Sequence, residues 1–384
     1  MRAAAPILAT VLGFLSALAP SAAADEVPVI LQQATLDEYM SYLRVLTGVD
    51  PIPGDPPYYL KNRYSLSTDI RKAANWLEAQ FESFGLAAEQ QTFQSNYGPN
   101  VVAELPGRTN PLDIYIIGGH YDTYHQANQL QAPGCDDNAS GTATALIAGR
   151  ILARYRFDAT LRFIAFAGEE QWMVGSLAYA AAARAAGENI VGVINLDMIL
   201  HPGFDNMNPD PDHDLDIESN AASAWLAQIV ATEFGLYTPI DVQIHIGDDL
   251  YSDHWAFWQH GYHAVGLSEN TVFEIWGGSN NAYHQLTDTI YNSTYEWDFA
   301  LHSVRGAIAS LVSIAGLIDV VVGDLNCDGR VDFGDINPFV LRLTSPAGYR
   351  LAFPGCPDAH GDINRDGLVD FGDINPFVRL LTSP

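Results

Sequence analysis

Apolar runs and patterns of helical period alternate along the middle of this chain, and this alternation constrains its fold more than any other feature. Short apolar runs typical of buried strands occupy residues 114–117, 161–167 and 190–196. Patterns of helical period occupy residues 68–84, 141–155, 175–186 and 225–234. Because a strand that is apolar on both sides must be covered on both sides, we predict an α/β fold with helices on either face of the sheet.

Polar side chains that can bind a metal follow each of these strands. His120, the pair Glu169-Glu170 and Asp197 come after the three apolar runs, in that order. Ligands of open α/β sheets bind outside the carboxyl ends of the strands. Further polar clusters lie at Asp136-Asp137-Asn138, Ser252-Asp253-His254 and Tyr283-His284. The sequence therefore predicts a site at this edge of the sheet.

The residue types at these positions are typical of a zinc centre. Two histidines and three carboxylates offer nitrogen and oxygen donors together, a combination that zinc accepts. A carboxylate between two ions can bridge them at about 3.5–4 Å, the spacing of two-metal hydrolytic sites. The second carboxylate of Glu169-Glu170 can then serve as a general base, because neighbouring residues after a strand point in different directions. We therefore predict a metal-dependent hydrolase.

Six motifs in this order resemble those of peptidase family M28, the co-catalytic di-zinc aminopeptidases. They are GGHYDTY, GCDDNASG, FAGEEQ, NLDMI, YSDHWAFWQHG and YHQLTDT. The resemblance covers most of residues 25–318 and is strongest over residues 118–289. It implies a three-layer α/β/α sandwich with a mixed, mostly parallel central sheet. It also implies a zinc aminopeptidase that acts on peptides or proteins with a free N-terminus.

The resemblance also implies the zinc ligands. Five residues hold two zinc ions: His120 and Asp197 on one, Glu170 and His284 on the other, and Asp137 between them. Asp136 competes with Asp137 for the bridging position on residue type alone. The family pattern places the bridge immediately before Asn138, which favours Asp137.

Three more residues take catalytic roles by the same resemblance. Glu169 is the general base, which deprotonates a metal-bridging water and later returns the proton to the leaving amine. Asp122 is the carboxylate that orients the histidine or the base region through hydrogen bonds. Tyr283 precedes the last histidine, where some family members use a tyrosine hydroxyl to stabilise the oxyanion.

Other interpretations of the same residues remain open. A single-zinc aminoacyltransferase such as a glutaminyl cyclase shares this fold, although the full set of ligands argues against it. A non-catalytic, calcium-dependent scaffold or adhesion protein is the alternative from another class. Ser252-Asp253-His254 suggests a hydrolytic triad, but no Gly-x-Ser-x-Gly turn surrounds the serine, so we interpret it as structural or substrate-positioning.

The composition and the first residues of the chain indicate which partners the protein can have and where it is located. The 46 acidic and 18 basic residues give a net charge of -28, which argues against nucleic acid and anionic membranes as partners. Residues 1–24 have the layout of a secretory signal peptide, so we predict a secreted protein, extracellular or at the cell surface. Cys327 and Cys356 could pair, which would leave Cys135 unpaired.

The end of the chain is an internal repeat. Residues 323–346 and 361–384 are identical at 19 of 24 aligned positions. Each copy has the spacing of an EF-hand-type calcium loop, with Gly329 or Gly367 at position 6. The ligands at positions 1, 3, 5, 7, 9 and 12 are Asp324, Asn326, Asp328, Arg330, Asp332 and Asp335, and then Asp362, Asn364, Asp366, Leu368, Asp370 and Asp373. Position 7 contributes its backbone carbonyl, so its side chain is free to vary.

The paired loops resemble a type I dockerin. The features that carry this resemblance are the aspartate at position 12 and the Asn-Pro-Phe-Val helix starts at Asn337 and Asn375. It implies a small helical module that binds two calcium ions and docks onto a cohesin-type partner. We therefore divide the chain into a signal peptide (1–24), a zinc peptidase domain (25–318) and a dockerin-like domain (323–384).

Overall fold

The computed structural model describes residues 22–202, 214–247, 252–269, 280–318 and 320–382. The predicted signal peptide lies outside these residues apart from its last three positions. No helix within these ranges is long and apolar enough to cross a membrane.

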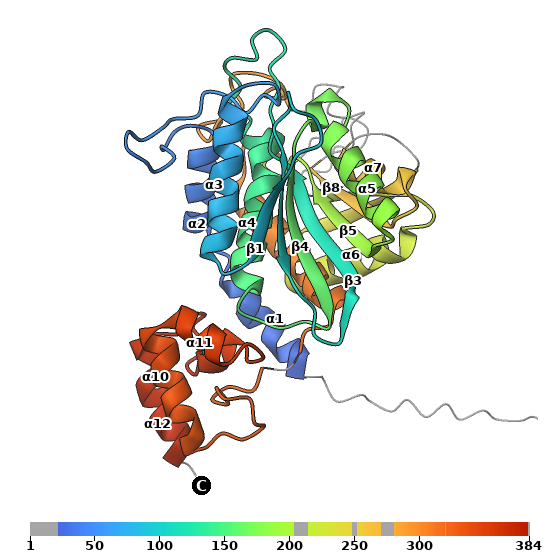
Figure 1. Cartoon of the computed structure of the whole chain (residues 1–384). Coiled ribbons are helices and arrows are strands. Elements are labelled where there is room, and N and C mark those ends of the chain that lie inside the picture. Colours follow the sequence, from blue (N-terminus) through green and yellow to red (C-terminus); the bar gives the residue numbers. More distant parts are fainter. Residues whose placement is uncertain (1–21, 203–213, 248–251, 270–279, 319, 383–384) are drawn as a thin grey trace, which may run out of the picture.

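An eight-stranded mixed sheet forms the centre of the larger part of the molecule (Figure 1), in the order β1-β2-β4-β3-β5-β8-β6-β7. The strands are β1 (Ala87–Gln91), β2 (Asn100–Leu105), β3 (Asn110–His120), β4 (Ala159–Phe166), β5 (Asn189–Leu196), β6 (Asp214–Ser219), β7 (Asp241–Ile246) and β8 (Ala264–Ser268). The pairs β3/β4, β3/β5, β5/β8 and β6/β7 are parallel, whereas β1/β2, β2/β4 and β6/β8 are antiparallel. This confirms the predicted mixed, mostly parallel sheet.

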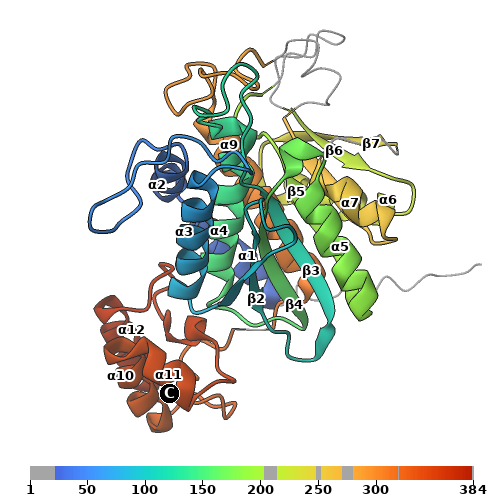
Figure 2. The same cartoon turned by 45° about the horizontal axis from the view of Figure 1, so that its top comes forward.

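Helices cover both faces of the sheet, as Figure 2 shows from a second direction. One face carries α1 (Ala22–Gln32), α2 (Leu36–Leu46), α3 (Asp69–Ser83), α4 (Ser140–Leu152), α6 (Ala224–Tyr237) and α9 (Trp297–Ala315). The other face carries α5 (Val174–Ala186) and α7 (Asp253–Gln259). The three-layer prediction is therefore confirmed.

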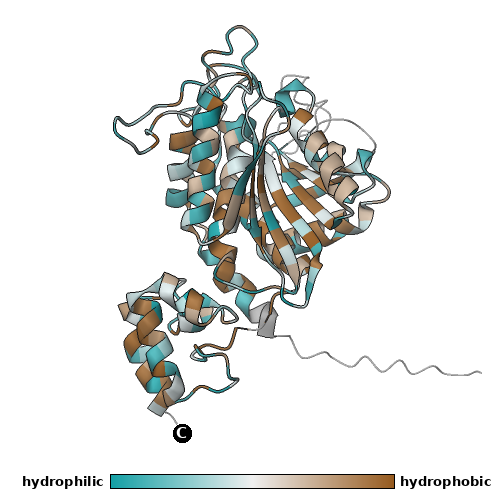
Figure 3. Ribbon diagram, in the orientation of Figure 1, coloured by the Kyte–Doolittle hydropathy of each residue, from teal (hydrophilic) through white to brown (hydrophobic). Residues whose placement is uncertain are grey.

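The central strands are apolar throughout because successive residues enter different cores. Ile116 packs with Tyr179 and Phe257 on the α5/α7 side, whereas its neighbour Ile117 packs into the core beneath α4 and α9. Both isoleucines are completely buried, and burial of such a side chain is worth about 1.5–3 kcal/mol. Figure 3 shows this as apolar colour along β3, β4 and β5. These three strands hold the carboxyl-end residues in fixed positions.

The repeat at the end of the chain forms a small helical unit with an apolar cluster of its own. Its helices are α10 (Ile336–Thr344), α11 (Pro346–Ala352) and α12 (Ile374–Thr382). Phe339 and Phe377, the same position in the two copies, face each other with ring centroids 4.5 Å apart. A disulfide joins Cys327 and Cys356, while Cys135 is free and buried.

The loops of this unit contact the larger part of the chain. The Arg154 guanidinium donates to the Gly367 carbonyl and lies 3.7 Å from an Asp362 carboxylate oxygen. Arg365 forms an ion pair of 3.1 Å with Glu26. The second calcium-type loop therefore lies against α1 and the end of α4.

Candidate metal centre

Two glycines fix the position of the first predicted ligand. His120 is the last residue of β3, and Gly118 and Gly119 precede it. A Cβ on Gly118 would lie 2.3 Å from the Ile164 carbonyl oxygen, and one on Gly119 would lie 2.4 Å from that of Leu196. Only glycine allows β4, β5 and the start of α4 to approach this closely. The Gly-Gly-His motif thus places the imidazole at the carboxyl edge of the sheet.

The predicted bridging residue lies in the turn Cys135–Ala139, immediately before α4. Asp288 holds this turn, because its carboxylate accepts the backbone N–H groups of Asp136 (2.7 Å) and Asp137 (3.1 Å). The same carboxylate accepts the Tyr295 hydroxyl at 2.6 Å. From the other side, Arg63 donates to the Gly134 carbonyl at 2.7 Å. The backbone of the turn is therefore held before any metal binds.

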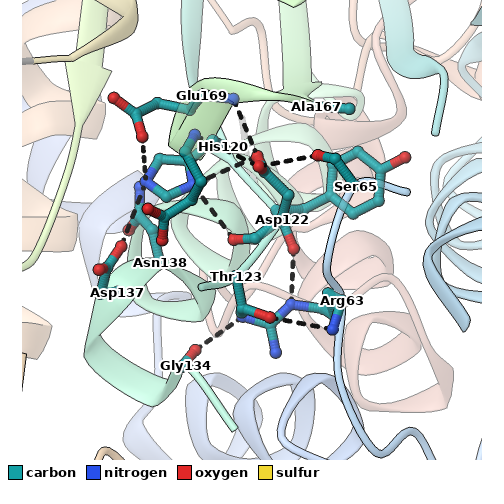
Figure 4. Close-up of polar contacts among 12 residues, drawn as sticks. Arg63, Ser65, His120, Asp122, Thr123, Gly134, Asp137, Asn138, Ala167 and Glu169 are labelled. Atoms are coloured by element: carbon teal, nitrogen blue, oxygen red, sulfur yellow. Dashed lines mark hydrogen bonds and ion pairs between the residues drawn. The ribbon is translucent and has the colours of Figure 1, made fainter. Parts of the chain in front are cut away.

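The Glu169-Glu170 pair begins a short 3-10 helix that follows β4. The buried Asp122 carboxylate accepts the N–H groups of Glu169 (3.2 Å) and Glu170 (3.3 Å) and the Ser65 hydroxyl (2.8 Å). Its Oδ1 also lies 3.5 Å from Nδ1 of His120 (Figure 4). Asp122 therefore holds the backbone of the predicted base, Glu169, and of the predicted ligand Glu170.

The five predicted ligands form two groups that share Asp137. In the first, Nε2 of His120 lies 3.4 Å from Oδ1 of Asp137 and 3.3 Å from Oδ1 of Asp197. In the second, Nε2 of His284 lies 3.1 Å from Oδ2 of Asp137 and 3.0 Å from Oε2 of Glu170. The two oxygens of Asp137 thus face different histidines, as a bridging carboxylate requires.

These separations fit zinc. Two ligand atoms on one tetrahedral zinc ion with bonds of 2.0–2.1 Å lie about 3.3–3.4 Å apart. The four separations above, between 3.0 and 3.4 Å, are close to that value. Glu170 also leaves its buried Oε1 without a hydrogen bond among the described residues, so this oxygen can bind a cation. The donor set and its geometry therefore fit two zinc ions.

Protonation of the metal-free site reflects the crowding of these groups. Burial alone would lower the pKa of His284, but its hydrogen bonds to Asp137 and Glu170 outweigh burial and raise that pKa to about 11. Burial raises the pKa of Glu170 to about 7, and Asp137 contributes in the same direction. Burial likewise raises the pKa of Glu169 well above its usual value. Bound protons thus offset the negative charge of these carboxylates, as bound divalent cations would.

Glu169 belongs to neither ligand group. Its Oε2 lies 3.9 Å from Nε2 of His120, farther than the ligand oxygens, and its side chain is 13% exposed. It also lines a hollow of about 530 Å³, which includes space open to solvent. A carboxylate beside the metal positions but not between them suits a general base.

The lining of this hollow mixes acidic, polar and apolar side chains. Its described residues are Asp137, Glu169, Glu170, Asn195, Asp197, Met198, Glu218, Ser252, His254, Gly266, Leu267, Ser268, Tyr283 and His284. Tyr283 stacks on the His284 ring with centroids 3.8 Å apart. Tyr283 thus lies beside the second ligand group, and its role in oxyanion stabilisation stays a prediction.

Ser252-Asp253-His254 lies at the start of α7 but does not have the arrangement of a triad. Ser252 accepts a hydrogen bond from the Asn195 amide at 2.9 Å, and Nε2 of His254 faces Glu218 at 3.4 Å. Burial lowers the pKa of His254 to about 4. The structural interpretation of this motif therefore fits better than the catalytic one.

Sequence reasoning assigned no supporting role to three further sets of residues around the site. Asp288 is the sixth residue of the motif YHQLTDT and holds the Asp137 turn, so its place in a quoted motif was the available signal. Asp136, Glu269 and Asn280 form a buried network behind the site, in which the Asn280 amide donates to both carboxylates at 2.8 Å. Glu218 lies in the wall of the hollow and belongs to no motif.

Sequence comparison assigns the family. The pattern of peptidase family M28 matches residues 100–309, more than half of the chain. The chain belongs to peptidase family M28. It is 33% identical over 211 residues to a probable zinc metalloprotease of the fungus Pyrenophora teres f. teres, an alignment that covers 49% of this chain and 43% of that protein. The chain thus spans less than half the length of this curated relative.

Solved structures share the fold of the M28 domain. The Legionella pneumophila LapA aminopeptidase superimposes with a TM-score of 0.64 at 19% identity, over 76% of this chain and 75% of that one. A glutaminyl cyclase of Porphyromonas gingivalis gives a TM-score of 0.57 at 18% identity, over 73% of this chain and 98% of that one. At these identities the similarity concerns the fold.

Proposed function

We propose that this protein is a secreted zinc aminopeptidase that removes the first residue of peptides with a free N-terminus. The observation that carries the proposal is Asp137, whose two oxygens face His120 and His284, each accompanied by one further carboxylate. This arrangement favours two metal ions over the single ion of a cyclase. Family membership and the probable zinc metalloprotease among the relatives support zinc.

In this proposal the side chains divide the work. Zinc ions bound by His120, Asp197, Asp137, Glu170 and His284 would polarise the substrate carbonyl and lower the pKa of water to about 7. Glu169 takes the proton of the attacking water and returns it to the leaving amine. Asp122 holds the backbone N–H groups of Glu169 and Glu170, so the base keeps its orientation. Tyr283 offers its hydroxyl to the developing oxyanion from the wall of the hollow.

The test measures zinc content and the hydrolysis of free and N-acetylated leucine p-nitroanilides by the purified protein. We expect about two zinc ions per chain and cleavage of the free substrate alone. Glu169→Gln should keep both ions while kcat falls roughly 10²- to 10⁴-fold. Glu89→Gln, the same change at an exposed position of β1, is the matched control and should leave both readouts unchanged.

Other outcomes would favour other functions. One zinc ion with cyclisation of N-terminal glutamine would support the cyclase interpretation, and zinc-free, inert protein would support a scaffold. A fully active Glu169→Gln variant with both metals bound would contradict the assignment of the base.

We further propose that residues 323–384 are a dockerin-like module that binds two calcium ions. In each loop the aspartates at positions 1 and 12 accept backbone N–H groups of their own loop, for example Gly329 to Asp324 at 3.0 Å and Gly367 to Asp362 at 2.9 Å. Both glycines have the left-handed φ that the sharp turn requires, +83° and +87°. Both loops therefore have, at position 6, the sharp turn that a calcium loop of this type requires.

We propose that the module's surface docks onto a protein partner of the cohesin type. Phe333 and Val340 are 73% and 50% exposed, and their counterparts Phe371 and Val378 are 75% and 52% exposed. Apolar side chains repeated at this exposure suit docking. Thermal unfolding of the full chain with calcium or a chelator tests the ion sites: calcium at 100 times its Kd should stabilise the module by about 2.7 kcal/mol per site. An Asp324→Ala, Asp362→Ala double variant should lose this response, whereas Asp298→Ala on α9 should keep it.

A further inference from the structure

A crevice lies where the module meets the larger part of the chain, beyond the ends of α3 and α4 (Figure 1). Its volume is about 680 Å³, which includes space open to solvent. Its described lining contains three arginines, Arg108, Arg156 and Arg350, and no aspartate or glutamate. The whole chain has 46 acidic residues and only 18 basic ones. The crevice is therefore positively lined in a protein that is strongly acidic elsewhere.

Two of these arginines have N–H groups without a strong acceptor. A guanidinium group has five N–H donors. Arg156 makes one hydrogen bond of normal length, to the Tyr155 carbonyl at 2.9 Å, and its contacts with two further backbone carbonyls are both 3.5 Å long. Arg108 donates to the Pro354 carbonyl. Among the described residues neither Arg108 nor Arg156 forms an ion pair, so their charge is available to an anion.

The positive charges are close enough to oppose one another. Burial lowers the pKa of Arg156, and the neighbouring guanidinium groups of Arg108 and Arg350 lower it further. Asp358 acts in the opposite direction, but its carboxylate is shared. Oδ2 of Asp358 lies 2.8 Å from Arg350 and 3.2 Å from Arg342. A further negative charge in the crevice would therefore relieve repulsion that the protein's own carboxylates leave in place.

The three arginines reach the crevice from different segments. Arg108 lies between β2 and β3, Arg156 lies between α4 and β4, and Arg350 lies on α11. Gly85, which follows α3, makes room for Arg350, because a Cβ there would lie 2.5 Å from Nη1 of that arginine. A carboxylate can be bound by one guanidinium group through both of its oxygens. Three guanidinium groups suit a tetrahedral anion, which offers more oxygens and, as phosphate or sulfate, more charge.

We propose that this crevice binds a phosphate or sulfate group, held by Arg108, Arg156 and Arg350. Phe84 and other apolar residues of the lining can contact the organic part of a monoester. Because Arg350 belongs to the module and the other two arginines do not, the bound anion links the two parts of the chain. The site shares no residue with the zinc-ligand groups.

The test is isothermal titration calorimetry of the full chain, loaded with zinc and calcium, with sodium sulfate at constant ionic strength. Sulfate is the probe because phosphate would precipitate calcium. We expect saturable binding of about one sulfate per chain. Arg156→Gln and Arg108→Gln should each weaken it roughly 10- to 100-fold, because each removes charge-assisted hydrogen bonds. Arg184→Gln, at an exposed position of α5, is the matched control and should keep the wild-type affinity.

Phenyl sulfate distinguishes a free anion from an ester, since it carries the same group on an apolar ring. Tighter binding than that of sulfate, despite the smaller charge, would support an ester whose ring contacts the apolar wall. Equal or weaker binding would support the free anion as the ligand.

Two results would overturn the proposal. One is the absence of saturable binding of both sulfate and phenyl sulfate, and the other is an unchanged affinity in Arg108→Gln. Arg108 is exposed, so this variant should fold even if Arg156→Gln does not. Peptidase activity serves as the check on folding and should be unchanged in all variants, because the described linings of the crevice and of the hollow share no residue.

Discussion

Asp288 allows the most direct test of how this site is assembled. Its carboxylate accepts three hydrogen bonds: from the N–H of Asp136 at 2.7 Å, from the N–H of Asp137 at 3.1 Å, and from the Tyr295 hydroxyl at 2.6 Å. Asp288→Asn keeps the shape of the side chain but replaces one acceptor oxygen with an NH₂ group. Because the NH₂ group would face a backbone N–H, which is also a donor, one or two of the three hydrogen bonds are lost.

The size of the effect follows from these bonds. Hydrogen bonds to a charged group contribute about 1.5–3 kcal/mol each, so we expect the metal-free variant to be about 2–4 kcal/mol less stable to unfolding. Loss of a residue that orients a metal ligand typically lowers metal affinity 10- to 100-fold. Because Asp137 belongs to both ligand groups, both zinc ions should bind more weakly. At saturating zinc, kcat should stay within about threefold of the wild-type value. The reason is that Asp288 is not among the described residues that line the hollow and belongs to neither ligand group.

The assay is a competition for zinc against a chelator of known affinity, together with urea unfolding of the metal-free protein. Burial raises the pKa of Asp288 to about 6, so the measurements at pH 8 keep this carboxylate ionised. Tyr295→Phe is the matched control, because it removes the hydroxyl donor but leaves the bonds to the Asp137 turn. Wild-type zinc affinity in a folded Asp288→Asn protein would refute the reasoning.

Three further predictions concern other parts of the chain. Burial lowers the pKa of His254 to about 4, below its unfolded value near 6.5, so neutral His254 stabilises the fold above pH 6.5 and this contribution is lost as the pH falls toward 4. It should amount to about 2 kcal/mol between pH 7.5 and 5 in urea unfolding of the metal-free protein, and His254→Gln should lack it. Reduction of the Cys327–Cys356 disulfide, whose ends are 29 residues apart, should destabilise the calcium-type module by about 3–4 kcal/mol and expose it to proteolysis, with peptidase activity unchanged. Arg154→Ala removes the contacts with Gly367 and Asp362 and should enlarge the particle in small-angle X-ray scattering without changing peptidase activity.

Each of these has a control. His260→Gln changes a histidine that directly follows α7 and is not among the described residues lining the hollow, and an equal effect in both variants would contradict the assignment to His254. Cys135→Ser should leave the effect of reduction unchanged, because Cys135 is already a free thiol. Arg184→Ala on α5, away from the module, should leave the scattering profile unchanged.

The sequence predicted the central strands, and it indicated the candidate metal ligands that the structure brings together, because both leave local signals. Ile116 and Ile117 enter different cores, so β3 appears as a continuous apolar run, and the ligands follow the strands directly. The edge strands leave no such signal: β1 reads AAEQQ, and most residues of β7 are exposed. No residue of either strand is buried, so neither a continuous apolar run nor an apolar/polar alternation marks them in the sequence.

The contacts of the supporting residues could not be predicted for a different reason. Asp288 acts on backbone groups about 150 residues earlier in the chain, and such a contact has no spacing to read. Glu218 faces the hollow only because β6 runs antiparallel to β8 in one particular register. A shift by one residue would turn the Glu218 side chain to the opposite face of the sheet. Strand order and register, and hence these roles, become visible only in three dimensions.

The single carboxylate between the two histidines would couple the binding of the two proposed zinc ions. The ligand groups contain three carboxylates, Asp137, Asp197 and Glu170, so three negative charges face the four positive charges of two zinc ions. A first zinc ion would neutralise part of Asp137, and a second would have to bind beside a neighbouring dication and share that carboxylate. We therefore predict that two zinc ions would bind anticooperatively, so that a protein loaded with one equivalent of zinc would consist mainly of molecules that each hold one ion.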